Sequence, residues 1–133
     1  MKKKKLGTVL AAPTDVILDN HSTLQPDILF VAMERREIIE PHAIVGPPDL
    51  IVEIISPGSV EQDRYEKKGL YEQHGVQEYW LVDPENKSVE ILALKEKRYE
   101  LAQVVSEKGE ILSYVIKGLK IDLAEIIPEG DGA

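Results

Sequence analysis

Short runs of apolar residues separated by turn residues cover most of the chain and predict β-strands. The clearest run, Asp-Leu-Ile-Val-Glu-Ile-Ile at 49–55, is rich in β-branched residues and apolar on both faces except for its carboxylates. Such a run is typical of a central strand that is covered on both sides. Similar runs predict the other strands, at residues 8–12, 14–18, 27–32, 78–82, 88–93, 98–105 and 111–116, and a short helix is expected at 123–127.

A helix is predicted between the strands at 49–55 and 78–82, over residues 59–74. Ser59 followed by Gln62 matches a capping box, and Gly75 stands where a left-handed glycine ends many helices. Strand, helix and strand then form one βαβ unit, whose two strands run parallel. Together with the remaining strands, this unit predicts an α/β fold with a mixed β-sheet and a flanking helix.

Length and composition fit one globular domain. The 133 residues are 43% hydrophobic and 30% charged, which is the size and balance of a single domain. We expect one domain over residues 1–133, with a core at 7–127 and frayed tails at 1–6 and 128–133. The absence of cysteine excludes disulfides and thiolate chemistry and fits a cytoplasmic protein. No apolar run approaches the roughly 20 residues of a membrane-spanning helix, so no membrane association is expected.

The charge of the chain limits how it could bind nucleic acid. A net charge of -8 and a pI near 4.9 provide no overall attraction to phosphate. The basic run Lys2–Lys5 is explained most simply as a solvated terminus. Binding to DNA would therefore depend on a local arrangement of charge.

Two acidic residues within predicted strands need partners. Glu53 lies mid-strand, with Ile51 and Ile55 on its own face, and Asp27 heads another strand. A buried carboxylate is costly unless it is paired, hydrogen-bonded or bound to a metal ion. If Asp27 and Glu53 converge across the sheet, their oxygens suit Mg²⁺ or Mn²⁺, and a water on that ion could act as a nucleophile. Purely structural hydrogen bonding of both acids is the alternative.

Asp49 is an unsuitable partner for Glu53. Four residues along one strand separate the two by about 13 Å, whereas the ligands of a magnesium ion lie about 2.1 Å from it. Asp49 is instead expected to accept hydrogen bonds from backbone amides where its strand begins.

Asp63 and Lys67 are four positions apart on the predicted helix. By themselves they describe an exposed helix pair worth roughly 0.3–0.5 kcal/mol. Close to two carboxylates, however, Lys67 could orient a water molecule or offset charge that develops on a phosphate.

Ordered motifs along the chain resemble a large bacterial family of restriction-endonuclease-like proteins within the PD-(D/E)XK nuclease superfamily. The resemblance runs from about Gly7 to Ile127 and implies a restriction-endonuclease-like mixed sheet and a metal-dependent endonuclease that hydrolyses DNA. The motifs are Gln25-Pro26-Asp27, Pro-Asp-Leu-Ile-Val-Glu-Ile-Ile-Ser-Pro at 48–57, Asp-Arg-Tyr-Glu-Lys at 63–67, Tyr71, and Gly-Val-Gln-Glu-Tyr-Trp-Leu-Val-Asp-Pro at 75–84.

The resemblance assigns roles to individual residues. Asp27 and Glu53 match the two acidic positions of the superfamily motif, which implies that they bind Mg²⁺ or Mn²⁺ together with the backbone carbonyl of Ile54. Ile55 stands where the superfamily usually carries its lysine. Lys67 on the following helix is implied to replace that lysine.

Asp63 is expected to support this catalytic set, which consists of Asp27, Glu53 and Lys67, by holding Lys67. Members of the family usually carry a further N-terminal region, so the chain resembles an N-terminally shortened member. Shortening would leave a sheet edge and an apolar face uncovered, and formation of a homodimer is one remedy. The alternative function is therefore a catalytically inactive, dimeric binding or interaction module built on the nuclease fold.

Overall fold

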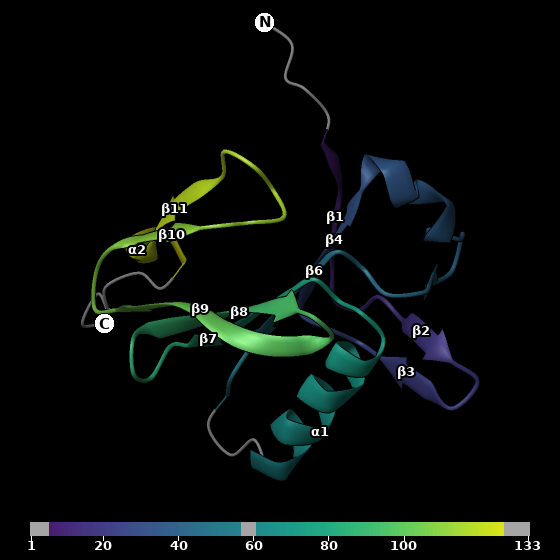
Figure 1. Ribbon diagram of the computed structural model, residues 1–133, viewed down its shortest axis with the longest axis horizontal. Helices are drawn as coiled ribbons and strands as arrows, with labels where there is room; N and C mark the ends of the chain where they lie inside the picture. The colour runs from purple at the N-terminus through teal and green to yellow at the C-terminus, as the bar shows by residue number, and fades with distance from the viewer. Residues whose placement is uncertain (1–5, 57–60, 127–133) are drawn as a thin grey trace, which may run out of the picture.

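A mixed six-stranded sheet forms the centre of the computed structural model (Figure 1), which describes residues 6–56 and 61–126, residues 61–63 by their backbone alone. Neighbouring strands are antiparallel except for β6 and β7, which run parallel. The strands in spatial order are β1 (Gly7–Ala11), β4 (Ile28–Ala32), β6 (Leu50–Ile54), β7 (Glu78–Asp83), β8 (Ser88–Lys95) and β9 (Arg98–Ser106).

The predicted βαβ unit is confirmed, with α1 (Glu61–Gln73) between the parallel strands β6 and β7. Gly75 follows the helix at φ +85°, a left-handed conformation that costs glycine little because it has no Cβ. The backbone N–H of Val76 then donates to the Tyr71 carbonyl at 3.0 Å and closes the last turn. The capping box predicted at Ser59 and Gln62 lies outside the residues and side chains that the structure describes.

One face of the sheet packs against α1 and a small three-stranded sheet. The small sheet consists of β2 (Val16–Asp19), β3 (Ser22–Leu24) and β5 (Ile44–Val45). Residues from every layer meet in the core on this face, which we call the helix face: Val16, Leu29, Val31, Ile44, Ile51, Tyr71, Val76, Tyr79 and Leu92. This face fixes the position of α1 over β4, β6 and β7.

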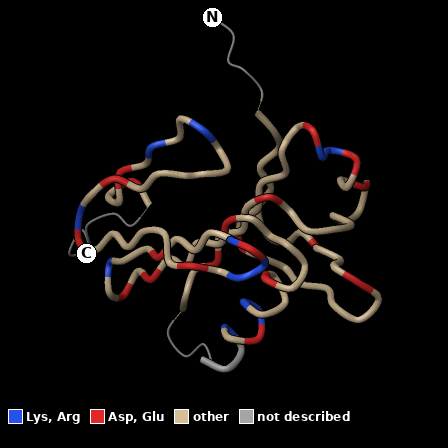
Figure 2. The backbone as a smooth tube through the Cα atoms, in the orientation of Figure 1, with Lys and Arg blue, Asp and Glu red and all other residues tan. Residues whose placement is uncertain are grey.

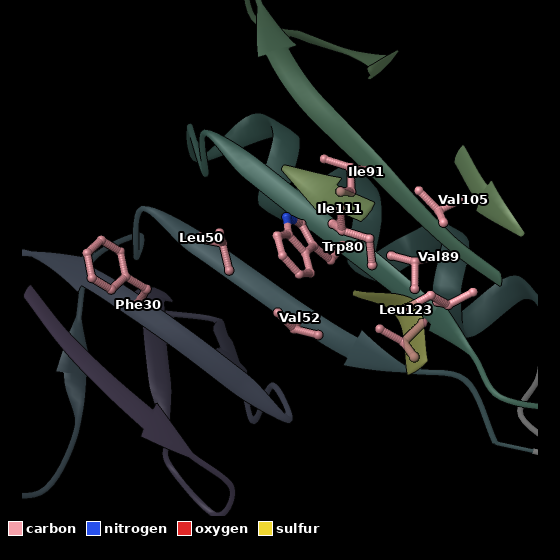
Figure 3. Close-up of a cluster of buried hydrophobic side chains, with 10 residues drawn as sticks. Phe30, Leu50, Val52, Trp80, Val89, Ile91, Val105, Ile111 and Leu123 are labelled. Atoms are coloured by element: carbon pink, nitrogen blue, oxygen red, sulfur yellow. The ribbon is translucent and has the colours of Figure 1, made fainter. Parts of the chain in front are cut away.

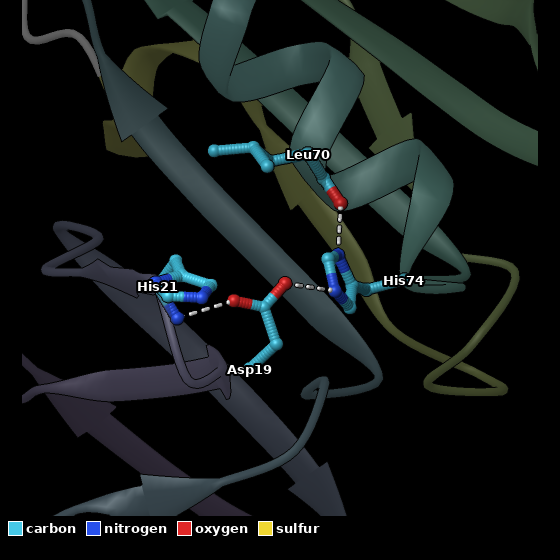
Figure 4. Close-up of polar contacts among 4 residues, drawn as sticks. All are labelled: Asp19, His21, Leu70 and His74. Carbon is cyan, nitrogen blue, oxygen red and sulfur yellow. Dashed lines mark hydrogen bonds and ion pairs between the residues drawn. The ribbon is translucent and has the colours of Figure 1, made fainter.

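The end of α1 is fastened to the small sheet by His74 (Figure 4). Its Nδ1 lies 2.9 Å from the Leu70 carbonyl, and its Nε2 lies 3.0 Å from Asp19 Oδ2. The backbone N–H of His21 donates to the other carboxylate oxygen of Asp19 at 2.8 Å and lowers the pKa of this acid. The orientation of the helix is therefore held at its C-terminal end by a polar contact as well as by the core.

The opposite face of the sheet is covered by a C-terminal unit of β10 (Glu110–Leu112), β11 (Lys120–Asp122) and α2 (Leu123–Ile126). Figure 3 shows Ile111 and Leu123 from this unit packed over Trp80 and its neighbours on the sheet. The predicted closing helix is confirmed as α2. The predicted strand at 111–116 is wrong in its second half, because β10 ends at Leu112 and pairs with β11, which the pattern did not predict.

Glu78 explains why this strand ends early. Its Oε1 accepts hydrogen bonds from the backbone N–H groups of Tyr114 at 2.9 Å and Val115 at 2.8 Å, so these donors are diverted from a β-ladder. The hydroxyl of Ser113 donates to the same oxygen, and the Trp80 indole donates to Oε2. Glu78 is fully buried and anchors the C-terminal unit to the first residue of β7.

Asp49 has the structural role that its sequence position predicts. Its Oδ2 accepts a 2.6 Å hydrogen bond from the backbone N–H of Ala32, and Arg35 Nη1 lies 3.3 Å from its Oδ1. Arg35 belongs to the 3₁₀ helix η1 (Met33–Ile38), which follows β4. The contacts of Asp49 with Ala32 and Arg35 join the end of β4 to the residue before β6. They help to set the register of β4 and β6, which position Asp27 and Glu53.

An apolar groove of about 430 Å³ lies between the sheet and the C-terminal unit. Val9 on β1 and Ile54 on β6 line it, with 64% and 47% of their surface exposed. The apolar surface of this groove is thus partly exposed, as the sequence led us to expect. Formation of a homodimer over it stays a prediction. Among the described residues, no helix is long and apolar enough to cross a bilayer.

Candidate active site

Asp27 and Glu53 lie on the helix face of the sheet, on neighbouring strands. In the antiparallel register of β4 and β6, Ile28 pairs with Val52, so the next position places Asp27 opposite Glu53. Alternation puts Glu53 on the same side as Ile51, and Asp27 on the same side as Leu29. Directly opposed residues have Cβ atoms about 4.5–5.5 Å apart. The structure therefore brings the two predicted acids together.

Asp27 is held by backbone groups of β6 and of the residue that follows β1. Its Oδ2 accepts a 2.7 Å hydrogen bond from the N–H of Ile54, and its own carbonyl accepts one from Ala12 at 2.9 Å. These contacts fix the carboxylate beside the end of β6. They engage the N–H of Ile54, whereas the metal-binding role expected for its carbonyl stays a prediction.

Glu53 is a buried acid with a small set of polar contacts, and only 9% of its surface is exposed. Its Oε2 accepts a 2.8 Å hydrogen bond from the Tyr71 hydroxyl, and Lys67 Nζ lies 4.0 Å from its Oε1. Burial raises the pKa of Glu53, and the charge of Asp27 adds to this effect. The Tyr71 hydrogen bond and the Lys67 charge lower that pKa without offsetting the burial. A further cation would therefore stabilise this carboxylate.

Helix α1 delivers Lys67 to the acidic pair, as predicted. Lys67 and Tyr71 are four positions apart and share one side of the helix, so both reach Glu53. The side chain of Lys67 is 39% exposed, and its ammonium group remains accessible to a ligand. The side chain of Asp63 lies outside the part of the chain that the structure describes, so its support of Lys67 stays a prediction.

A cavity of about 230 Å³ opens at this point. It is lined by Gln25, Asp27, Glu53, Ile54, Ile55, Ser56, Arg64, Lys67 and Tyr79. All three predicted catalytic residues thus share one cavity with a second cation, Arg64. Figure 2 shows that acidic and basic positions are interspersed along the backbone. The two positive charges of Arg64 and Lys67 are therefore a local concentration of positive charge in a chain that is acidic overall.

Two residues of the site, Tyr71 and Arg64, were present in the sequence motifs but received no role from sequence reasoning. Helical spacing was the available signal, because Arg64, Lys67 and Tyr71 follow one another at intervals of three and four. In addition, the hydroxyl of a buried tyrosine usually has a hydrogen-bond partner. The identity of that partner, Glu53, depends on how α1 packs on the sheet.

Replacing Tyr71 by phenylalanine is expected to destabilise the protein by about 1–2 kcal/mol at pH 7.5, because Glu53 loses its hydroxyl donor. The pKa of Glu53 should rise further, so the loss should be smaller at pH 4, where the carboxyl group is protonated. Urea denaturation at both pH values measures this difference.

Tyr99→Phe is the matched control for this prediction. It removes a hydroxyl that donates to the Val76 carbonyl at 2.7 Å rather than to an acid. Its cost should be the same at both pH values. Equal losses at pH 4 and pH 7.5 for Tyr71→Phe would contradict the interaction with an ionised Glu53.

The mixed sheet, the helix over its parallel pair and the two opposed acids define a restriction-endonuclease-like α/β fold. A crystal structure from Anabaena variabilis ATCC 29413, described as "a putative nuclease belonging to DUF820", is similar to this chain with a TM-score of 0.72. The two sequences are 20% identical, and the match covers 91% of this chain and 68% of the other. At this identity the similarity shows the fold.

The family model Uma2, described as "Putative restriction endonuclease", matches residues 1–124. The chain belongs to this family. No curated protein matches the sequence.

Proposed function

We propose that this protein is a metal-dependent nuclease that hydrolyses phosphodiester bonds in DNA. One observation carries the proposal: Asp27 and Glu53 oppose each other on the helix face, and Lys67 Nζ lies 4.0 Å from Glu53 Oε1. Membership of a restriction-endonuclease-like family supports the same class of chemistry. The fold, the acids and the lysine are then parts of one site.

The donor set suits a hard divalent cation. Among the described residues, no group of three histidine, cysteine or acidic side chains converges on one point, so the protein offers two carboxylates. Mg²⁺ is commonly held by one or two carboxylates while it keeps several waters and binds substrate phosphate. The raised pKa of Glu53 is consistent with a site that gains from a cation. Mg²⁺ or Mn²⁺ fits these residues.

Asp27 and Glu53 would hold the ion, with the Ile54 carbonyl as a further oxygen donor. When bound, the ion would polarise the scissile phosphate and lower the pKa of a coordinated water. Tyr71 orients the Glu53 carboxylate through its hydroxyl. Lys67 donates hydrogen bonds to the attacking water or to the phosphate, where negative charge develops as the water oxygen attacks phosphorus and the P–O bond to the leaving group breaks. The attacking water gives a proton to solvent, and the leaving oxygen takes a proton from solvent.

Isothermal titration calorimetry with MgCl₂ tests the proposal. The wild-type protein is expected to bind Mg²⁺ at one site, and both Asp27→Asn and Glu53→Gln are expected to abolish the binding heat. Asp49→Asn is the matched control, because this acid is already occupied by Ala32 and Arg35. It should leave Mg²⁺ binding unchanged.

Absence of binding at millimolar Mg²⁺ and Mn²⁺ would overturn the proposal. That result would favour the alternative of an inactive binding module on the nuclease fold. Binding that survives both acid substitutions would place the ion elsewhere and would also refute the assigned site.

A further inference from the structure

Arg64 is a cation in the active-site cavity that the proposed metal site does not use. It lines the same cavity as Asp27, Glu53 and Lys67. Its position three residues before Lys67 places both cations on the same side of α1. Lys67 Nζ lies 4.0 Å from Glu53 Oε1, whereas Arg64 forms no ion pair with any side chain that the structure describes.

The guanidinium group of Arg64 is incompletely satisfied. Its Nε is buried and has no hydrogen-bond partner among the described residues. A buried donor without a partner costs about 1–3 kcal/mol, and more when the group is charged. Because the Nε atom itself is buried, a ligand would bind the part of the guanidinium group that lines the cavity.

The surroundings of Arg64 indicate where such a ligand would lie. Arg64 and Tyr79 line the same cavity, and the positive charge of Arg64 lowers the pKa of Tyr79 against the larger effect of burial and the charge of Glu53, which raise it. Tyr79 is buried in β7 and also lines the cavity. Arg64 and Lys67 therefore bring two positive charges to the cavity that holds the acidic pair.

We propose that Arg64 binds a phosphate of the nucleic-acid backbone and thereby positions the phosphodiester against Asp27, Glu53 and Lys67. This inference rests on the proposed nuclease function and adds a substrate-binding residue to it. A guanidinium group offers donors in a planar fork that matches the oxygens of a phosphodiester. In a chain with a net charge of -8, two adjacent cations provide the local attraction that the overall charge lacks.

Binding to a short fluorescein-labelled DNA duplex, followed by fluorescence anisotropy in EDTA over a range of salt concentrations, tests the inference. EDTA prevents cleavage, and wild type and variants are then compared with the same empty metal site. Arg64→Gln is expected to weaken binding about tenfold and to lower the slope of log affinity against log salt by about 1. Arg64→Lys keeps the charge, so it should restore the slope and only part of the affinity.

Lys68→Gln is the matched control, because it removes one positive charge from the same helix at a position outside the cavity. It should change the affinity less than about twofold. Equal effects of Arg64→Gln and Lys68→Gln, or an unchanged salt slope for Arg64→Gln, would overturn the role of Arg64. Thermal unfolding of Arg64→Gln shows whether the substitution also affects the fold. If that variant is unfolded, the DNA affinity and salt slope of Arg64→Lys decide the question instead.

Competition with inorganic phosphate distinguishes the source of the phosphate group. If the wild-type protein binds inorganic phosphate through Arg64 but does not bind the DNA duplex, the assignment of Arg64 to nucleic acid is overturned. If Arg64→Gln leaves DNA binding unchanged while the protein binds Mg²⁺ through Asp27 and Glu53, only the proposed role of Arg64 is refuted. Failure of the Mg²⁺ titration removes the proposed nuclease instead.

Discussion

Glu53→Gln protein is expected to lose metal-dependent DNA cleavage by at least about 100-fold and yet to be more stable than wild type at pH 7.5. The loss follows because the amide cannot replace a charged metal ligand. The gain follows because an uncharged side chain is cheaper to bury, and its carbonyl still accepts the Tyr71 hydrogen bond. A gain of about 1 kcal/mol is typical of substitutions that remove a functional compromise from an active site.

The stability difference should depend on pH in a defined direction. Burial raises the pKa of Glu53 above its ordinary value of 4.5. The contribution of Glu53 to the stability of the wild type is therefore full below that value and is lost as pH rises through the pKa of Glu53 in the folded state. Glu53→Gln and wild type should be equally stable at pH 4 and diverge as pH increases. Urea denaturation in EDTA across this range measures the difference.

Excess Mg²⁺ should reverse the order of stability. It stabilises only a folded state that binds it, so wild type should gain while Glu53→Gln should not. A variant that is less stable than wild type at pH 7.5 in EDTA would show that Glu53 serves the fold through its contacts with Tyr71 and Lys67. Wild-type cleavage by a pure preparation of the variant would refute the role of Glu53 in catalysis.

Glu78→Gln is expected to have the opposite effect on stability, a loss of about 2–3 kcal/mol. Both oxygens of Glu78 accept hydrogen bonds, from the Trp80 indole and from Ser113, Tyr114 and Val115. A glutamine amide would replace one acceptor by a donor, and a buried N–H group would then face another donor. The contacts between β7 and the C-terminal unit should weaken as a result.

Trp80 is the single tryptophan of the chain, and its indole contacts Glu78, so its fluorescence reports this unfolding directly. Ser113→Ala is a milder variant in the same network, because it removes one hydroxyl and should cost about 1 kcal/mol. Equal stability of Glu78→Gln and wild type would contradict the anchoring role of Glu78. The two buried glutamates should thus differ in the effect of a Gln substitution on stability. Four groups donate hydrogen bonds to Glu78, whereas Glu53 accepts one from the Tyr71 hydroxyl and lies near Lys67.

Much of the fold was predictable because its strands are strongly periodic and its helix is bounded by recognisable residues. The alternation of β6 placed Glu53 on one face, and the predicted helix after this strand carried Lys67, four positions after Asp63. The motif order then paired Asp27 with Glu53, which the register of β4 and β6 confirms.

The parts that sequence reasoning missed depend on contacts between distant segments. The end of β10 is set by Glu78, which is more than 30 residues away from Tyr114 and Val115. Similarly, the partner of Tyr71 and the burial of Arg64 Nε without a partner among the described residues follow from the packing of α1 on the sheet. The local pattern of apolar and polar residues predicts which helices and strands form. These polar contacts cannot be predicted from it, because they arise only when the sheet, α1 and the C-terminal unit pack together.

The central claim is that one divalent cation binds between Asp27 and Glu53. A crystal of the wild-type protein soaked in MnCl₂ tests it most directly, through the anomalous signal of manganese. We predict a single strong peak within coordination distance of both carboxylates, and no peak there in Glu53→Gln crystals. A wild-type map without a peak between these acids, or with the ion at Asp49 instead, would contradict the account.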